Sequence, residues 1–283
     1  MPEKEVLRPA ALVTGASSGI GATFARVLAA IGCDLILVAR RKDRLDALAA
    51  ELGEAYGVAV EPVEADLADP AALRQVEERI AAAPRLEFLI NNAGFGSRGR
   101  FLELDAEAAE RMHRVHITAT LRLTHAALRI MVPRRAGAII NVSSVSAFAP
   151  MPGSVSYSAT KAWIVAFSRS LQMELKSAGS PVRVQALCPG FTITEFHDRL
   201  DMDRSEIPEC WWMSSEQVVA ESFRGLSRNQ LIVVPGMQYR VLVCLLRWLP
   251  QALYDYGAIA AARKRGRDMS PLAPSSPQPE VPE

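Results

Sequence analysis

Short apolar runs alternate with longer stretches of helical periodicity along most of the chain. Between residues 10 and 235, the apolar runs have the length and composition of buried strands. These runs are Ala11–Val13, Leu35–Val38, Val58–Val60, Phe88–Ile90, Ala138–Val142, Val182–Leu187 and Leu231–Val234. The segments between them, such as Arg44–Ala55 and Pro70–Ala82, repeat apolar residues at the spacing of an amphipathic helix. This alternation indicates a parallel sheet that is covered by helices on both faces.

We therefore predict an α/β fold: a single doubly wound parallel-sheet (Rossmann) domain over residues 8–262, with helices on both faces and ligands at the carboxyl ends of the strands. Residues 191–214 interrupt the alternation and contain Trp211. They predict a long loop, with or without a short helix, that acts as a substrate lid. Residues 236–262 form an apolar extension, and residues 263–283 are basic and then rich in proline, which predicts a disordered tail.

The composition is that of an ordinary soluble protein. The chain has 283 residues, of which 49% are hydrophobic and 22% charged, and its formal net charge is +1. This balance of charge gives no support to nucleic-acid binding. The four cysteines are scattered without metal-ligand spacing and no signal peptide is evident, so we expect no metal site and a cytoplasmic, reducing location.

The late apolar stretch Leu231–Tyr254 is interrupted by Arg240 and Arg247, whereas a membrane span needs about 20 apolar residues. Within it, Val241–Tyr256 could form an amphipathic cover over a pocket, a subunit contact or a helix on a membrane surface, and the sequence leaves all three open. A basic cluster follows, which we interpret as a solvated helix end, with contact to an anionic surface as the alternative. Its members are Arg263, Lys264, Arg265 and Arg267.

A glycine-rich turn, Thr14–Gly21, follows the first predicted strand and opens the first predicted helix. Gly15 permits a tight turn, Gly19 lets the backbone approach a pyrophosphate, and Gly21 allows close helix–strand packing. The helix presents free N–H groups and its positive dipole end to the phosphate. The predicted phosphate-binding residues are Gly15, Ser17, Ser18, Gly19, Ile20 and Gly21.

Two arginines after the second predicted strand indicate which dinucleotide binds. A site for NAD usually has an acidic residue here for the ribose 2′-hydroxyl, whereas this chain has Arg40 and Arg41, followed by Lys42. Guanidinium groups bind a 2′-phosphate through charge-assisted hydrogen bonds. We therefore predict NADP(H), with Arg40 and Arg41 as its ligands, and keep NAD(H) as the alternative. In the other interpretation, Arg41 and Lys42 are only the polar start of the next helix.

Tyr157 and Lys161 are four residues apart, so that on a helix the phenol and the ammonium would lie on one face. A phenol has a pKa of about 10, and a neighbouring cation favours the phenolate. Ser144 would add a hydrogen-bond donor for a carbonyl or alkoxide oxygen. The pair alone is a weak signal, because many helices have such a surface pair by chance.

Five motifs occur together, and in this order and spacing they closely resemble the short-chain dehydrogenase/reductase family over residues 8–235. The motifs are the glycine turn, Asn91–Gly94, Ser144, Tyr157-x-x-x-Lys161 and Pro189-Gly190. The resemblance implies that Tyr157 is the general acid/base, that Lys161 lowers its pKa and holds the nicotinamide ribose, and that Ser144 orients the substrate oxygen.

The resemblance also implies further contacts with the cofactor, at the adenine, at the adenine ribose and over the nicotinamide. The residues are, in that order, Asp66 and Leu67; Asn92, Ala93 and Gly94; and Pro189, Gly190, Thr192 and Thr194.

The chain departs from the family pattern at His116, where family members usually have an asparagine that completes a catalytic tetrad through its backbone carbonyl and a water. A backbone role survives substitution, so loss of activity is not implied. Because histidine titrates near neutrality, His116 could slow the proton relay or shift the pH profile. The equally weighted alternative is that His116 only packs in the central helix.

We accordingly expect an NADP(H)-dependent oxidoreductase that interconverts a ketone or aldehyde and an alcohol, with Tyr157 as the general acid/base. Aromatic residues near the motifs indicate an apolar substrate, although each could equally be an ordinary core or dimer contact. The predicted pocket residues are Phe95, Phe148, Phe191 and Trp211. The resemblance suggests a homodimer or homotetramer. The alternative function is a nucleotide-binding regulatory or scaffold protein with little or no turnover.

Overall fold

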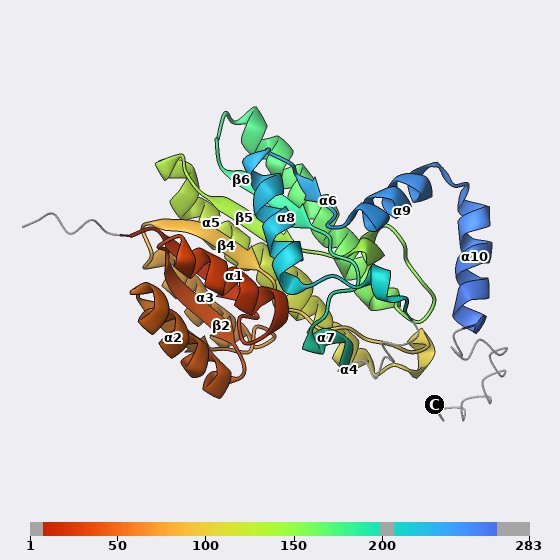
Figure 1. The fold of residues 1–283 in the computed structure, drawn as a ribbon, viewed down its shortest axis with the longest axis horizontal. Coiled ribbons are helices and arrows are strands. Elements are labelled where there is room, and N and C mark those ends of the chain that lie inside the picture. The colour runs from red at the N-terminus through yellow and green to blue at the C-terminus, as the bar shows by residue number, and fades with distance from the viewer. Residues whose placement is uncertain (1–7, 199–206, 265–283) are drawn as a thin grey trace, which may run out of the picture.

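The computed structural model describes residues 8–198 and 207–264. A seven-stranded parallel sheet runs through the centre of the molecule in the order β3-β2-β1-β4-β5-β6-β7 (Figure 1). The strands are β1 (Ala10–Thr14), β2 (Asp34–Ala39), β3 (Val60–Glu64), β4 (Leu86–Asn91), β5 (Ala138–Val142), β6 (Arg183–Leu187) and β7 (Ile232–Val233). The winding reverses between β1 and β4, the place where such sheets bind ligands. The predicted fold class is confirmed.

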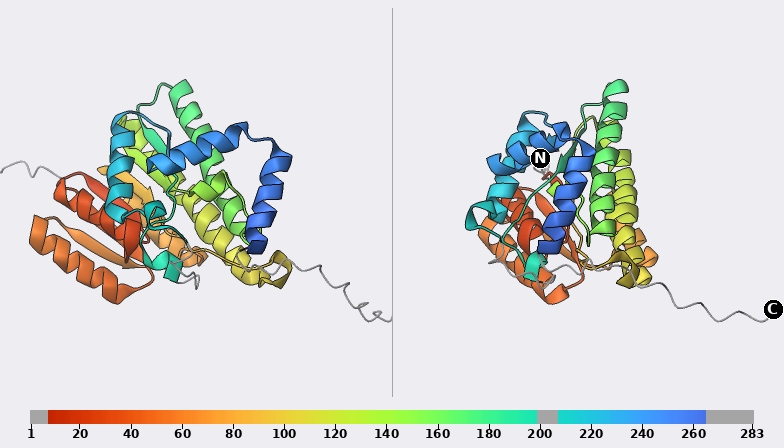
Figure 2. Two further views of the ribbon diagram at one scale, coloured as in Figure 1. Left: turned by 45° about the vertical axis from the view of Figure 1, so that its right-hand side comes forward. Right: turned by 90° about the vertical axis from the view of Figure 1, so that its right-hand side faces the viewer.

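Helices cover both faces of the sheet, as the end-on view in Figure 2 shows. One face packs against α1 (Gly19–Ala30), α2 (Lys42–Tyr56) and α8 (Ser215–Ser227), and the other against α3 (Pro70–Ala81), α5 (Thr120–Arg134) and α6 (Val155–Ser177). Successive strand residues point to opposite faces, so that Val13 belongs to the first core and Leu12 to the second. These two cores hold the sheet rigidly between the helices. The carboxyl ends of its strands then position the residues of the site.

Strand β3 begins at Val60, where the predicted run Val58–Val60 ends, so the prediction placed this strand too early in the sequence. Val58 is buried, but it follows the left-handed Gly57 that closes α2, and it lies outside the strand. The strand itself, Val60–Glu64, pairs only with β2 in the sheet order and mixes valines with glutamates and a proline. An edge strand tolerates proline and polar residues, which hides it from a search for apolar runs.

The C-terminal extension forms two helices, α9 (Met237–Trp248) and α10 (Gln251–Lys264), rather than the single helix considered for Val241–Tyr256. Pro250 separates them, and Leu249 before it is extended (ψ 128°), as a residue preceding proline prefers. Figure 1 shows α10 standing at the edge of the molecule. The hydroxyl of Tyr254 on α10 donates a hydrogen bond to the Pro150 carbonyl (2.6 Å).

The predicted boundary at residue 263 falls inside α10, and the rest of the basic and proline-rich tail lies outside the described residues. The predicted lid contains a short helix, α7 (Glu195–Asp198), and a 3-10 turn at Glu209–Trp211, with residues 199–206 again outside the description. Within the described ranges, no helix has the length and apolar character needed to cross a membrane.

Candidate active site

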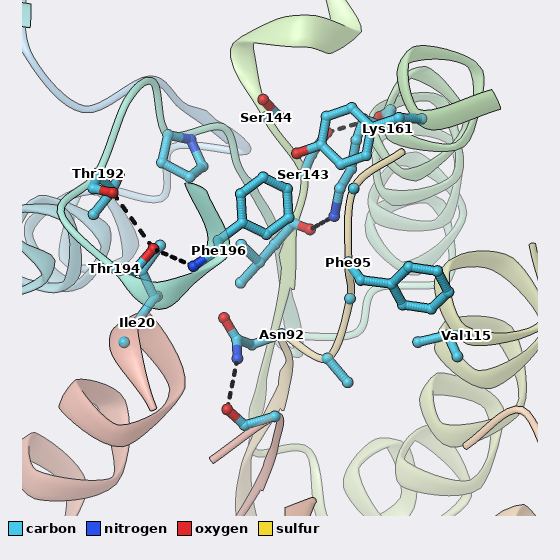
Figure 3. A pocket seen from close by; sticks show the side chains of 18 of the residues that line it. Ile20, Asn92, Phe95, Val115, Ser143, Ser144, Lys161, Thr192, Thr194 and Phe196 are labelled. Carbon is cyan, nitrogen blue, oxygen red and sulfur yellow. Dashed lines mark hydrogen bonds between the residues drawn. The ribbon is translucent and has the colours of Figure 1, made fainter. Parts of the chain in front are cut away.

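A cavity of about 400 Å³ lies where the carboxyl ends of the strands meet (Figure 3). Most of the residues predicted for the cofactor and the chemistry line it, although they come from seven separate stretches of sequence. They are Gly15, Ser17, Ser18, Gly19, Ile20, Arg40, Arg41, Asp66, Leu67, Asn92, Ala93, Gly94, Phe95, Ser144, Tyr157, Lys161, Pro189, Gly190, Phe191, Thr192 and Thr194.

The glycine turn packs so tightly against its neighbours that its glycines have no room for a side chain. Gly15 and Gly19 have left-handed φ values of +66° and +53°. A Cβ on Gly21 would lie 2.3 Å from the Gly15 carbonyl oxygen, and one on Gly19 would lie 2.8 Å from Thr194 Cγ2. The turn therefore leaves its backbone open to a ligand at the start of α1, which fits the pyrophosphate of a dinucleotide.

Thr14 and Asn92 join the carboxyl ends of β1 and β4 beneath this turn. The Thr14 hydroxyl accepts hydrogen bonds from the backbone N–H groups of Asn92 (2.9 Å) and Ala93 (3.0 Å). The Asn92 amide in turn donates to the Thr14 carbonyl (2.9 Å). These bonds hold the two sides of the ligand crevice in register.

Tyr157 and Lys161 lie one turn apart on α6, facing Ser144 at the end of β5. Lys161 Nζ is 5.7 Å from the centroid of the Tyr157 ring and donates a hydrogen bond to the Val142 carbonyl (2.9 Å). The Ser144 hydroxyl accepts a hydrogen bond from the backbone N–H of Ser146 (3.1 Å), which fixes its position. The structure thus brings together the three polar groups that the sequence singled out.

Burial controls the ionisation of this pair. It raises the pKa of Tyr157 to about 12, against the opposing effect of a hydrogen bond with Ser144. It also lowers the pKa of Lys161 to about 8. The expected lowering of the Tyr157 pKa by Lys161 is therefore not found, and the phenol is protonated near pH 7. In this state Tyr157 can donate a proton to an oxygen in the cavity.

The comparisons with known proteins agree with this geometry. The family model "short chain dehydrogenase" matches residues 9–205. The chain belongs to the short-chain dehydrogenase family.

Its similar solved structures include a short-chain dehydrogenase from Sphingobium yanoikuyae in complex with NADPH. The two are 38% identical, the TM-score is 0.76, and the match covers 95% of this chain and 99% of the other. The bulky-bulky ketone specific alcohol dehydrogenase from Comamonas testosteroni is 32% identical, with a TM-score of 0.73 and coverage of 94% and 97%.

Among curated relatives, a 3-oxoacyl-(acyl-carrier-protein) reductase, FabG, of Aquifex aeolicus is 36% identical over 185 residues, which are 65% of this chain and 74% of the relative. The predicted family and enzyme class are confirmed: this short-chain dehydrogenase is an oxidoreductase for CH–OH and C=O groups. The neighbours that bind NADPH and an NADP derivative also support the predicted NADP(H) cofactor.

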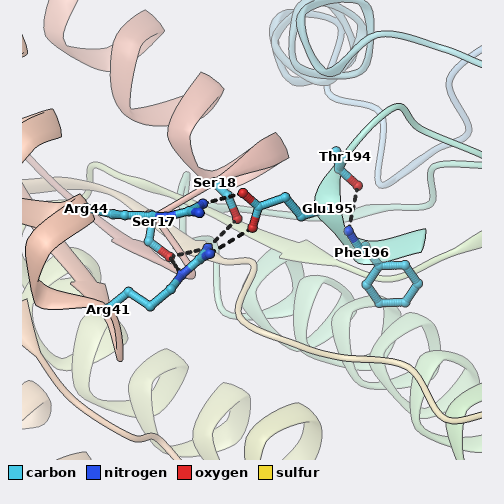
Figure 4. A network of polar contacts seen from close by, with 7 residues as sticks. All are labelled: Ser17, Ser18, Arg41, Arg44, Thr194, Glu195 and Phe196. Carbon is cyan, nitrogen blue, oxygen red and sulfur yellow. Dashed lines mark hydrogen bonds and ion pairs between the residues drawn. The ribbon is translucent and has the colours of Figure 1, made fainter. Parts of the chain in front are cut away.

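Arg41 precedes α2 as its N-cap, and its side chain extends to the phosphate-binding turn (Figure 4). Its guanidinium donates hydrogen bonds to the hydroxyls of Ser17 (3.0 Å) and Ser18 (2.9 Å). Lys42, in contrast, forms an ion pair with Asp46 (2.7 Å) one turn along α2. Arg40 is exposed at the rim of the cavity. Of the polar residues at the start of α2, Arg41 is therefore the one aimed at the turn.

The sequence analysis missed two members of this network, Arg44 and Glu195. Glu195, the first residue of α7, pairs with Arg41 (2.8 Å) and with Arg44. Hydrogen bonds from Arg44 and then Arg41 lower the pKa of the Glu195 carboxyl to about 2. Arg44 follows Arg41, the N-cap of α2, by three residues, a spacing that brings both side chains to one side of the helix start and could have been recognised.

His116 does not line the cavity and is buried in a π-helical turn, Arg114–Ala119, between α4 (Ala106–His113) and α5. Its Nε2 accepts a hydrogen bond from the Phe95 N–H (3.1 Å), so Nδ1 bears the proton and donates to Thr160 Oγ1 (2.8 Å). Burial lowers the pKa of His116 well below its usual value. The expectation that it titrates near neutrality is therefore wrong, and the packing alternative agrees with the structure.

Two of the four predicted pocket aromatics lie outside the cavity. Trp211 packs edge-on against Tyr239 (5.2 Å between ring centroids), which places it against the core. Phe148 closes the 3-10 turn Val145–Ala147 and is not a lining residue. Phe95 and Phe191 line the cavity, and Phe196, which the sequence analysis did not select, lies 5.8 Å from the Tyr157 ring. Nearness to a motif in sequence did not predict which aromatics face the ligand.

Proposed function

We propose that this protein is an NADP(H)-dependent oxidoreductase that interconverts a bulky, apolar ketone and its alcohol, with Tyr157 as the general acid/base. The observation that supports this most is one continuous cavity with Arg41 and the phosphate turn at one end and Tyr157, Lys161 and Ser144 at the other. This is the arrangement that a 2′-phosphorylated dinucleotide and a carbonyl compound require together.

The residues would divide the binding of the cofactor along its length. Arg41 and Arg40 would hold the 2′-phosphate and the glycine turn the pyrophosphate. The adenine and its ribose would contact Asp66, Leu67, Asn92, Ala93 and Gly94, and the segment with Pro189, Gly190, Thr192 and Thr194 would close over the nicotinamide.

The side chains of this protein would supply proton transfer, by Tyr157, and a positive charge that stabilises the phenolate, on Lys161. When bound, the nicotinamide supplies or accepts the hydride. In reduction, Tyr157 protonates the substrate oxygen, Ser144 orients that oxygen by a hydrogen bond, and the Lys161 ammonium stabilises the phenolate that forms. In oxidation Tyr157 removes the alcohol proton. The buried site makes these electrostatic interactions strong.

Apolar side chains at the Tyr157 end support the choice of substrate. Phe95, Met151, Phe191 and Phe196 line the cavity there. Similar structures include the bulky-bulky ketone specific enzyme already described and a 7β-hydroxysteroid dehydrogenase, 30% identical. A ketone with two large apolar substituents would fill such a pocket and bury its surface.

The test is turnover of bulky and small ketones with NADPH by wild type and by Tyr157→Phe, next to NADPH binding by calorimetry. We expect Tyr157→Phe to lose turnover by about 10²–10⁴-fold, the usual contribution of a general acid, while NADPH still binds. Tyr56→Phe, which changes an exposed tyrosine outside the cavity, is the control. Tight NADPH binding without turnover of any ketone would instead favour the regulatory or scaffold alternative.

The predicted homodimer or homotetramer, the cytoplasmic location and the membrane-surface contact of the C-terminal helices stay predictions. Helix α9 does expose apolar side chains, among them Val241, Leu245 and Trp248, which suit either a subunit contact or a lipid surface.

A further inference from the structure

The carboxylate of Glu195 lies between the guanidinium groups of Arg41 and Arg44. One of its oxygens pairs with Arg41 (2.8 Å) and the other with Arg44 (Figure 4). The Arg41 guanidinium also donates hydrogen bonds to the hydroxyls of Ser17 and Ser18. One guanidinium therefore contacts both the Glu195 carboxylate and the phosphate-binding turn. The segment that follows β6 thereby reaches across the cavity to the start of α2.

The position of the carboxylate conflicts with the role proposed for Arg41. A 2′-phosphate has three acceptor oxygens and about −1.5 to −2 charge at pH 7, and it needs the same N–H donors. Glu195 accepts from Nη1 of Arg41, while Nε and Nη2 of Arg41 bond the hydroxyls of the turn, so a phosphate that takes Nη1 has to displace the carboxylate. Because the pKa of Glu195 is lowered to about 2, its charge opposes the phosphate throughout the neutral range.

We propose that Glu195 is a cofactor-specificity residue whose carboxylate competes with the 2′-phosphate of NADP(H) for Arg41 and Arg44. This inference rests on the proposed NADP(H) function. It adds that a cofactor with a 2′-phosphate must displace the Glu195 carboxylate from the arginines, which lowers the binding free energy of that cofactor alone. A cofactor without that phosphate leaves the Glu195 pairs intact. Glu195 therefore makes the preference for NADP(H) over NAD(H) smaller than the arginines alone would make it.

The same contact connects the two ends of the cavity. Glu195 is followed by Phe196, whose backbone N–H donates to Thr194 Oγ1 (3.4 Å) and whose ring lies 5.8 Å from that of Tyr157. The first two residues of α7 therefore contact opposite ends of the cavity, Glu195 the arginines and Phe196 the phenol.

The experiment measures binding alone, by calorimetry on the full chain, with 2′,5′-ADP and 5′-AMP as probes. We expect Glu195→Gln to tighten 2′,5′-ADP binding by about tenfold, within the range usual for coupled groups, and to change 5′-AMP binding by less than about twofold. Glu51→Gln is the matched control, since Glu51 also pairs with an arginine, Arg26 (2.7 Å), but lies outside the cavity.

A double-mutant cycle with Arg44→Ala separates competition from a general effect of charge. If Glu195 and the phosphate compete, Arg44→Ala weakens 2′,5′-ADP binding more in the Glu195→Gln background than in wild type. Weaker or unchanged 2′,5′-ADP binding by Glu195→Gln, equal shifts for both probes, or an Arg44→Ala effect that is the same in both backgrounds would overturn the proposal. Wild type that bound 2′,5′-ADP no more tightly than 5′-AMP would instead contradict the NADP(H) function itself.

Discussion

The two ends of the cavity hold their ionisable groups in opposite ways. At the phosphate end, Arg41, Arg44 and Glu195 are partly exposed and satisfy one another's charges, with the pKa of Glu195 lowered to about 2. At the Tyr157 end, burial opposes charge, so that the pKa of the phenol is raised to about 12 and that of Lys161 lowered to about 8. The carboxylate of Glu195 keeps its charge at every physiological pH, whereas Lys161 at the Tyr157 end can change its charge near neutrality.

This difference suits the two tasks. Recognition of a phosphate needs permanent cations whose donors have a fixed geometry. Proton transfer needs a group whose protonation can change during the reaction and a dry environment in which a neighbouring charge acts strongly. The comparison predicts that substitutions at the Tyr157 end lower the rate constant kcat, while those at the phosphate end change the affinity for one cofactor.

The largest effect should follow the loss of the buried cation. We expect Lys161→Met, which keeps the length of the side chain, to lower kcat for ketone reduction by about 100-fold or more, because no charge then stabilises the Tyr157 phenolate. Steady-state kinetics with NADPH provide the measurement, and Lys176→Met on the last turn of α6 is the control. A loss confined to the KM for NADPH would show that Lys161 serves only to hold the cofactor.

The next largest effect should be on cofactor choice. Arg41→Ala removes charge-assisted hydrogen bonds worth about 1.5–3 kcal/mol, so the Kd for NADPH should rise about 10- to 100-fold while that for NADH changes little. Arg40→Ala should have the smaller effect, since Arg40 is exposed at the rim. Fluorescence titration with both cofactors measures this. Equal losses for NADH and NADPH in Arg41→Ala would remove the assignment of the 2′-phosphate to this residue.

How far the sequence predicted these two ends differs, for physical reasons. The glycine turn and the spacing of Tyr157 and Lys161 are local patterns, and each places its groups without knowledge of the rest of the fold. Glu195 is 154 residues from Arg41 along the chain, so no local pattern could reveal their pairing. Burial is also a property of the folded molecule. It reversed the expected pKa shift of Tyr157 and removed the expected titration of His116.

The helices and strands show the same limit. The buried strands β1, β2, β4, β5 and β6 were recognisable because both of their faces are apolar. Edge strand β3 was misplaced because glutamates and a proline interrupt its valines, and the aromatic Trp211 was assigned to the pocket although it packs on Tyr239. The alternation of apolar runs fixes the order of layers, but it does not say which side chain at a loop turns inward.

The pH dependence sharpens the comparison. Lys161 is a cation below its pKa of about 8 and loses its charge above it, so kcat/KM for reduction should fall as pH rises through about 8. Binding of 2′,5′-ADP should stay constant between about pH 7 and 9, because the Glu195 carboxyl, with its pKa lowered to about 2, stays ionised there. Initial rates and calorimetry over this range measure both. In Lys161→Arg the fall should move to higher pH, and an unmoved midpoint would assign the titration to another group.

The smallest effect should come from His116, which is buried near Tyr157 yet neutral. His116→Asn introduces the residue usual in the family and breaks the bonds to Phe95 and Thr160, so we expect about 1–3 kcal/mol of lost stability, as for a buried hydrogen-bond partner. Chemical denaturation measures this, with His125→Asn, at an exposed position, as the control. Because His116 does not charge near neutrality, the midpoint of the pH–rate profile should stay where Lys161 puts it. A midpoint that moves in His116→Asn would mean that the imidazole takes part in the proton relay. His116 would then belong with Lys161 to the groups at the Tyr157 end that control the pH dependence.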